Sequence, residues 1–194
     1  RLRGLSAAKR GANDAVSFLQ TAQGGMQEVS NIIVRMKELT LAAGTTTMSD
    51  RERRFLFLEY EALYEEVNRI AQSTEFNGIP LLNGESDKVP EEMVFRLGDP
   101  LEGTTPDGGT GDINTVRFDG FKNISVTPDG LGLKSARELL DASGETDGIG
   151  IDDVEETLLA ADDPEFSTAF DQAMNKLSTQ RAEFGAFESR LDKV

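Results

Sequence analysis

The stretch NIIVRMKELT, Asn31–Thr40, places apolar and charged residues at the spacing of an α-helix. Ile33, Met36 and Leu39 recur every three residues and share one face, whereas Arg35 falls on another. The stretch therefore predicts an amphipathic helix. Two interpretations of its charged faces stay open: a core helix of a compact domain, or a helix built to bind other copies of the chain.

The same apolar pattern continues on both sides of this stretch with a seven-residue repeat. Its two interleaved series are Ala12, Leu19, Met26, Ile33 and Thr40, and Ala15, Ala22, Val29 and Met36. The repeat predicts one helix from near Leu5 to Ala43, roughly 55 Å long at 1.5 Å per residue. Gly24 and Gly25 weaken it locally, by about 1 kcal/mol each relative to alanine.

Two further helices carry a seven-residue repeat. Ser49 and Glu52 form a capping box at the start of one, and Asp163 precedes Pro164 at the start of the other. The repeats are Tyr60, Val67 and Thr74 with Leu56, Leu63 and Ile70, and Phe170, Leu177, Phe184 and Leu191 with Ala173, Gln180, Phe187 and Val194. Because such a stripe is stable only when covered, the first and last helices are expected to lie side by side.

The middle of the chain changes to turn residues and short alternating segments. Met93–Leu97 predicts a strand, and Ile113–Phe118 and Asn123–Val126 predict a hairpin about the Asp119-Gly120 pair. Ser135–Ala142 and Asp152–Ala161 predict short helices.

The predicted fold is mainly α with a small β region, a long antiparallel, coiled-coil-like rod of three helices capped by β-hairpins and a short variable insert. The expected domains are rod helices and hairpin over 1–84, a β-rich and short-helix region over 85–162, and a C-terminal rod helix over 163–194 that packs on the N-terminal helices.

Arg51, Arg53 and Arg54 crowd the first turn of the second helix, where the helix dipole is positive. Two interpretations stay open for this cluster: side chains solvated on the surface, or a contact for an acidic neighbour.

Composition narrows the function classes. The net charge of −15 disfavours nucleic acid and anionic membranes as partners, and the longest apolar run, Phe55–Leu58, is far too short to span a bilayer. Histidine and cysteine are both absent, which removes the commonest general base, metal ligand and thiol nucleophile. No catalytic, cofactor-binding or metal-binding residues are predicted, and the chain is not expected to be an enzyme.

Ser143–Glu156 resembles the calcium loop of an EF-hand in spacing, with Gly148 at the required turn position. However, serine stands where the first ligand should be aspartate, and Val154 stands where a bidentate glutamate belongs. The segment keeps one alternative open, an acidic helical binding module that takes calcium or a basic partner.

Several separate motifs resemble those of bacterial flagellins. They are ANDAVSFLQTAQGG and RMKEL in the first helix, FNGIPLLNG after the second, VFRLG in the following strand, and RAEFGAFESRL in the last helix. These motifs stand in the order of the family. The family's outermost helical tips are missing at both ends, so the resemblance implies a core fragment that lacks both tips.

The resemblance implies a structural subunit of the flagellar filament that polymerises into a helical tube for motility. It implies further copies of the chain as partners, with an export chaperone for the full-length protein. The implied location is an extracellular filament, or alternatively a periplasmic flagellum. A hook–filament junction protein, which shares the heptad ends, is the other alternative, although FNGIPLLNG is more similar to filament flagellins.

The resemblance also implies contact residues. In flagellins bound by the animal Toll-like receptor for flagellin, the matching stretch of the rod forms the epitope. The matching positions here are Arg35, Leu39 and Glu59. Subunit–subunit contact and receptor recognition are both expected roles for these residues, and mere solvation of the rod is the alternative.

Overall fold

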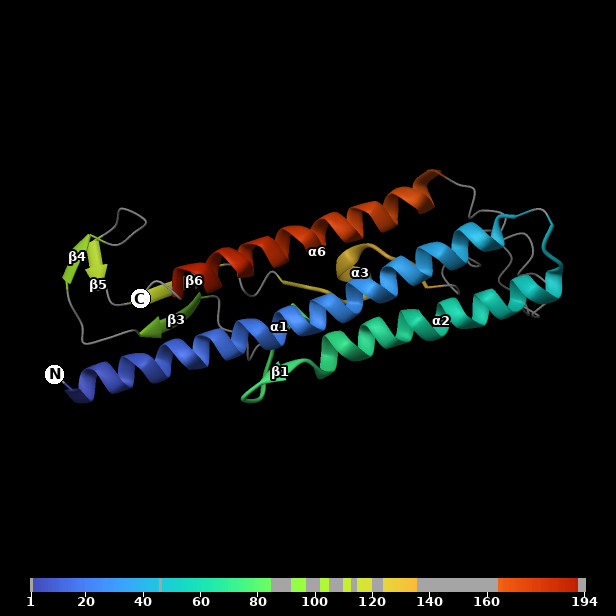
Figure 1. Cartoon of the computed structure of the whole chain (residues 1–194). Helices are drawn as coiled ribbons and strands as arrows, with labels where there is room; N and C mark the ends of the chain where they lie inside the picture. The colour runs from blue at the N-terminus through green and yellow to red at the C-terminus, as the bar shows by residue number, and fades with distance from the viewer. Residues whose placement is uncertain are drawn as a thin grey trace.

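Three long helices lie side by side and form an elongated rod (Figure 1). They are α1 (Leu2–Ala43), α2 (Asp50–Ser73) and α6 (Pro164–Leu191). The structure is a computed structural model, and it describes residues 2–45, 47–84, 92–96, 102–104, 110–112, 115–119, 124–135 and 164–191. α1 runs antiparallel to both α2 and α6 and packs on both, so the two chain ends lie at the same end of the rod. The mainly helical rod with a small β part confirms the predicted fold class.

The seven-residue stripes form the core between the helices. The buried members are Ala15, Leu19, Ala22, Met26, Val29, Ile33 and Met36 of α1, Tyr60, Val67 and Ile70 of α2, and Phe170, Ala173, Leu177, Phe184 and Leu191 of α6. Burying such apolar side chains stabilises the fold by about 1.5–3 kcal/mol for each large one. The predicted packing of the first helix on the last is therefore confirmed.

Side chains at the start of α2 hold the end of the turn that joins α1 to α2. Glu52 Oε2 accepts hydrogen bonds from Ser49 N at 2.9 Å and Ser49 Oγ at 2.7 Å, as the predicted capping box requires. The bond from the Ser49 hydroxyl, then that from its backbone, lowers the pKa of Glu52 below its ordinary value.

The position of Arg53 fits neither interpretation of the arginine cluster, because its side chain is buried. It is only 6% exposed, and its Nη2 donates to the carbonyl oxygen of Thr45 at 3.2 Å. Its Nε and Nη1 are buried without a hydrogen-bond partner. Arg51, by contrast, is exposed and lies over the ring of Phe55, 6.0 Å from the ring centre.

A two-residue hairpin follows α2. β1 (Glu75–Phe76) pairs antiparallel with β2 (Ile79–Pro80) across a turn in which Asn77 and Gly78 have φ of 52° and 76°. Two consecutive positive φ values are typical of a type I′ turn, which is why Asn-Gly stands here. The hairpin brings Phe76 to within 5.8 Å of Phe18 in α1, centre to centre.

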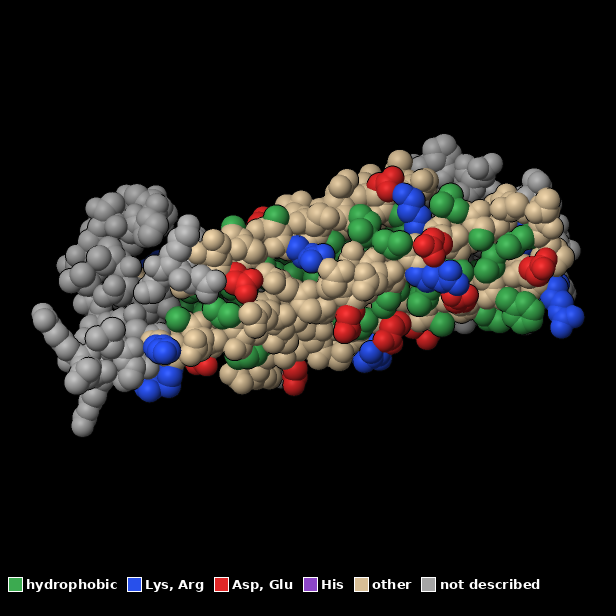
Figure 2. Space-filling model, in the orientation of Figure 1, with side chains coloured by type: hydrophobic (Ala, Val, Ile, Leu, Met, Phe, Trp, Pro, Cys, Tyr) green, Lys and Arg blue, Asp and Glu red, His purple; other side chains and the backbone are tan. Residues whose placement is uncertain are grey.

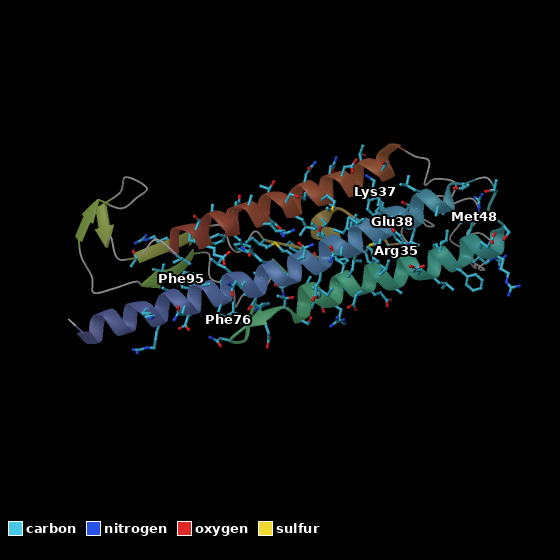
Figure 3. The ribbon with its side chains drawn as sticks, viewed as in Figure 1. Arg35, Lys37, Glu38, Met48, Phe76 and Phe95 are labelled. Atoms are coloured by element: carbon cyan, nitrogen blue, oxygen red, sulfur yellow. The ribbon has the colours of Figure 1, made fainter. Side chains whose placement is uncertain are left out.

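The predicted hairpin about Asp119-Gly120 is wrong. β6 (Thr115–Asp119) pairs antiparallel with β3 (Glu92–Arg96), so its partner lies earlier in the chain rather than after the turn. β3 confirms the strand predicted near Met93, and its Phe95 also packs edge-on against Phe18 at 5.8 Å (Figure 3). A further antiparallel pair, β4 (Glu102–Thr104) and β5 (Thr110–Asp112), lies past the C-terminal end of α6 (Figure 1).

Residues 124–126 instead run beside the segment that follows β2. Val126 N donates to Leu82 O at 2.7 Å, and Ser125 forms an antiparallel bridge with Asn83. The chain then enters α3 (Pro128–Leu131), which contacts both α2 and α6 and so links the two helices that α1 separates.

The short helices predicted over Ser135–Ala142 and Asp152–Ala161 lie outside the described residues, apart from Ser135, and so does the calcium-like loop Ser143–Glu156. Within the part of the chain that is described, no helix has the length and apolarity needed to cross a bilayer.

Candidate functional site

Arg35 and Glu59, which lie 24 residues apart in the sequence, meet on the surface where α1 packs on α2. Arg35 donates from Nη2 and Nε to Glu59 Oε1, at 2.7 and 2.9 Å, and from Nη1 to Glu38 Oε2 at 3.3 Å. All three side chains remain at least 40% exposed. The hydrogen bond that Glu59 accepts, followed by that which Glu38 accepts, raises the pKa of Arg35 above its ordinary value, so the guanidinium stays charged.

Leu39 has a different position from the other two predicted contact residues. Its side chain is 3% exposed and belongs to the core. α1 packs against α2 on one side and α6 on the other, so the buried stripe of this central helix is wider than that of a helix with a single partner. The structure thus brings Arg35 and Glu59 together on the surface and places Leu39 beneath them.

Large apolar side chains lie exposed on the same two helices. Leu41 is 63% exposed, Leu58 is 61% exposed and Phe55 is 59% exposed, and Val34 is nearly half exposed. Val34 and Leu41 share a stripe of α1 with Glu38, and Phe55 and Leu58 share a stripe of α2 with Glu59. We call this set, Val34, Arg35, Glu38, Leu41, Phe55, Leu58 and Glu59, the α1–α2 face.

The α1–α2 face lies toward the end of the rod at which α1 turns into α2. Because the helices are antiparallel and Arg35 bonds Glu59, Leu41 lies level with the first turns of α2. Figure 2 shows apolar side chains gathered over this end of the two helices, with charged side chains among them. Figure 3 shows Arg35 and Glu38 on the same part of α1.

Lys37 lies on the other side of α1 and bonds α6. Its Nζ donates to Asp171 Oδ1 at 2.6 Å, across 134 residues of sequence. Within RMKEL, therefore, Arg35 and Glu38 lie on the side of α1 that faces α2, and Lys37 lies on the side that faces α6. Met36 and Leu39 are buried in the core.

The chemistry of the α1–α2 face suits contact between macromolecules. It combines exposed apolar side chains with the Arg35–Glu59 ion pair, whose two side chains are still partly exposed to solvent. Surface patches that mix apolar and charged groups in this way are typical of protein interfaces. Among the described residues, no group of three or more acidic side chains is arranged to hold a metal ion.

The exposed apolar members of this face were missed by the sequence reasoning. A signal was present, because Val34 and Leu41 are separated by seven residues yet fall outside both buried series of α1. Phe55 and Leu58 likewise stand apart from both series of α2, which begin at Leu56 and Tyr60. When two apolar residues lie on the same face of a helix but outside its buried stripe, the sequence indicates a second face that is buried or binds a partner.

Residues 1–87 match the family described as the N-terminal helical region of bacterial flagellin. Among curated proteins, the flagellar filament 41 kDa core protein of Borreliella burgdorferi is 27% identical, over all of this chain and 66% of the relative. Polar flagellin F of Vibrio parahaemolyticus is 34% identical, over 80% of this chain and 44% of the relative. The chain thus spans from under half to about two thirds of the length of these two relatives.

The fold agrees with these matches. The crystal structure of Bacillus cereus flagellin superposes with a TM-score of 0.63 at 25% identity, over 94% of this chain and 85% of that one. The similarity therefore extends beyond residue 87. The N-terminal 87 residues thus match the flagellin family, and the chain as a whole is similar to bacterial flagellins in sequence and fold.

Proposed function

We propose that this chain is a structural subunit of the bacterial flagellar filament and associates with further copies of itself through the α1–α2 face. The observation that carries the proposal is the uncovered apolar area of Leu41, Phe55 and Leu58 on the flank of the rod. Apolar area left in water on a rigid rod favours association, because each square ångström removed from water contributes about 25 cal/mol. The filament would lie outside the cell or, as a periplasmic flagellum, within the envelope.

The test is Leu58→Glu in the bacterium that carries this gene, with filaments counted by electron microscopy and swimming measured in soft agar. A charge at this position would have to be desolvated in the interface, so few or short filaments are expected. The matched control is Val94→Glu, because Val94 is also an exposed apolar residue but lies on β3, away from the α1–α2 face.

Normal filaments with Leu58→Glu would contradict the proposed subunit contact. Equal loss with both variants would show that the defect is not specific to the α1–α2 face. Circular dichroism of the purified variants, compared with the unmodified protein, separates lost association from lost folding.

We also propose that the Arg35–Glu59 pair contributes to recognition by the animal Toll-like receptor for flagellin. Arginine is enriched among residues that dominate binding energy, and this one presents a planar guanidinium on a rigid helix pair. Its partner carboxylate holds it in one orientation, which reduces the conformational entropy lost on binding. The apolar surface beside it would come from Val34 and Leu41, since Leu39 is buried.

Receptor activation by purified monomer in reporter cells tests this second role. Arg35→Ala and Leu41→Ala are expected to weaken activation, by roughly tenfold or more for Arg35 if it acts as a hot spot. Arg69→Ala is the matched control, because Arg69 is also exposed and paired within α2, with Glu66. Unchanged activation by Arg35→Ala would remove that residue from the epitope.

A further inference from the structure

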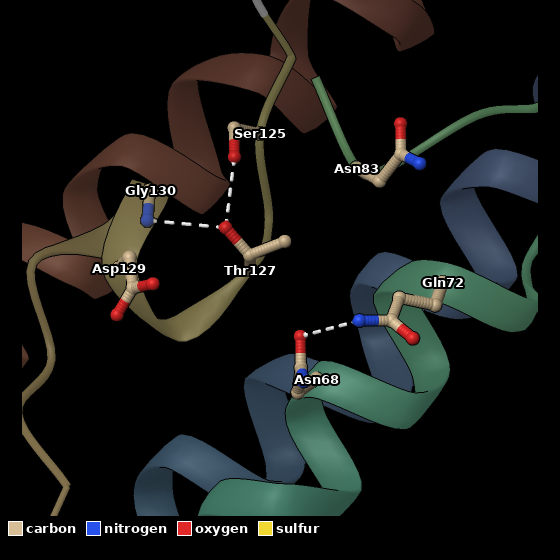
Figure 4. A pocket seen from close by; sticks show the side chains of 7 residues that line it. All are labelled: Asn68, Gln72, Asn83, Ser125, Thr127, Asp129 and Gly130. Carbon is tan, nitrogen blue, oxygen red and sulfur yellow. Dashed lines mark hydrogen bonds between the residues drawn. The ribbon is translucent and has the colours of Figure 1, made fainter. Parts of the chain in front are cut away.

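A polar groove lies between α2 and the segment that enters α3 (Figure 4). Its volume is about 730 Å³. The described residues that line it are Asn68, Gln72, Asn83, Ser125, Thr127, Asp129 and Gly130. Asn68 follows Glu59 by nine residues, which is half a turn about the axis of α2 at 100° per residue. The groove also lies farther along α2, since Asn68 follows Leu58 by ten residues, or about 15 Å. None of its described lining residues belongs to the α1–α2 face, so it is independent of the proposed function.

The wall of the groove is built by close packing about Ser125. A Cβ atom on Gly130 would lie 2.2 Å from Ser125 Oγ, and one on Gly84 would lie 2.6 Å from Ser125 Cβ. Glycine at both positions thus lets three chain segments approach to a spacing that no side chain would permit. Ser125 Oγ lies 3.0 Å from Thr127 Oγ1, which in turn accepts a hydrogen bond from Gly130 N at 3.1 Å. These contacts hold the hydroxyl wall in one arrangement.

The opposite wall carries carboxamides. Gln72 Nε2 donates to Asn68 Oδ1 at 3.2 Å, which fixes this pair along α2 and leaves the Gln72 oxygen and the Asn68 nitrogen for other partners. Between the two walls, Asn83 Oδ1 is buried without a hydrogen-bond partner. A buried acceptor without a donor is unfavourable by about 1–3 kcal/mol, so this atom favours a ligand or water molecule that brings an O–H or N–H group.

The lining also limits the charge of a ligand. Asp129 is the one ionisable group among the described residues that line the groove, and its carboxylate disfavours phosphates and carboxylates. Its Oδ1 already accepts the hydroxyl of Tyr64 at 3.1 Å, so one of its lone pairs is occupied. No apolar side chain stands among those same lining residues, which disfavours an apolar ligand.

We propose that this groove binds a neutral, hydroxyl-rich ligand, namely one or two sugar units. Carboxamides present a donor and an acceptor side by side, and hydroxyl groups act as both, so the lining can pair with the alternating donors and acceptors of a sugar ring. The volume lies within the range of about 300–1,000 Å³ of small-molecule sites. The free donor of Asn68 and the free acceptor of Gln72 bond adjacent sugar hydroxyls.

The test is a titration of the ¹⁵N-labelled chain with methyl α-glucoside and with N-acetylglucosamine, followed by NMR. Saturable shifts are expected in the side-chain amide signals of Asn68, Gln72 and Asn83, and Asn68→Ala should remove them. Gln27→Ala is the matched control, because Gln27 makes the equivalent carboxamide bond to Asn31 on α1 at 3.0 Å, outside the groove. It should leave sugar binding unchanged.

N-acetyl-arginine amide serves as the cationic probe, and Asp129→Asn distinguishes the two ligand classes. Sugar shifts that persist in Asp129→Asn support the proposal, because the neutral amide still accepts a hydrogen bond. Saturation by the arginine probe but by neither sugar would overturn it and assign a cation site to Asp129. Linear, non-saturating shifts with both sugars would also overturn it, since the groove would then hold only water.

Discussion

Arg53 is a charged side chain in a buried place, and its surroundings satisfy it only in part. One of its nitrogens bonds the carbonyl of Thr45 beyond the end of α1, where a positive charge complements the helix dipole. Two others have no partner. A buried charge with unpaired donors opposes folding, whereas the aliphatic part of the same side chain packs favourably. The two effects can be separated by substitution.

Arg53→Met is expected to fold with a stability within about 1 kcal/mol of the unmodified chain or higher, because methionine keeps the packing and removes the buried charge. Arg53→Ala is expected to lose about 1–3 kcal/mol, because it leaves a cavity. Urea unfolding followed by circular dichroism measures both. A methionine variant clearly more than about 1 kcal/mol less stable than the unmodified chain would mean that the bond to Thr45 outweighs the cost of the buried charge.

Glu52 predicts a dependence of stability on pH. The Ser49 hydroxyl and backbone N–H lower its pKa in the folded state, so its contribution to stability is fully present above the ordinary carboxyl pKa. The contribution is lost as the pH falls through the lowered value. Glu52→Gln should therefore destabilise the chain near neutral pH, and the difference from the unmodified chain should shrink in acid. Urea midpoints at several pH values test this, and a difference that grows in acid would contradict it.

Single residues of the candidate site were only partly predictable. Arg35 and Glu59 were placed correctly on the surface because polar residues off the apolar stripe face solvent. The burial of Leu39 depends on α6 packing on α1 opposite α2, and that width of the core is a property of three helices together rather than of local spacing.

At the scale of elements, long periodic helices were the most predictable and paired strands the least. The α1 stripe repeats over several turns, and each repeat adds to the same signal. β6 has five residues, and its choice of β3 over the nearer segment 124–126 is decided by contacts with the rod. Phe118 of β6 stacks on Phe184 and packs edge-on against Phe187, both in α6, with ring centres 5.3 and 4.5 Å away. A turn signal such as Asp119-Gly120 carries no information about those distant rings.

The glycine pair of α1 provides an element-scale prediction. A Cβ atom on Gly24 would meet nothing within 4 Å, whereas one on Gly25 would lie 2.7 Å from Leu82 Cδ1 and 2.8 Å from Thr74 Oγ1. Gly24→Ala should therefore stabilise the chain by about 0.5–1 kcal/mol through helix propensity alone. Gly25→Ala should destabilise it despite the same propensity gain, because it presses the helix against the β1–β2 region. Thermal unfolding of the two variants gives the comparison, and equal shifts of the midpoint would contradict it.

At the scale of the whole molecule, shape follows from helix length. α1 has 42 residues and so extends about 63 Å. A compact domain of 194 residues would have a radius of gyration near ~16 Å. We expect small-angle X-ray scattering to give a radius above roughly 20 Å and a profile typical of a rod. A radius of gyration near ~16 Å would mean that the chain is compact in solution and does not form the extended rod.

The position of α6 on α1 also has a consequence for the order of folding. α1 is made first, but the residues that cover one side of its stripe are among the last, and Lys37 bonds Asp171 across 134 positions. Contacts of such long sequence separation slow folding, because a large loop must close before they form. A nascent chain therefore keeps that side of α1 uncovered until α6 has been made. Until then it remains a substrate for anything that holds unfolded chains, and completion of α6 is the event that commits it to the rod.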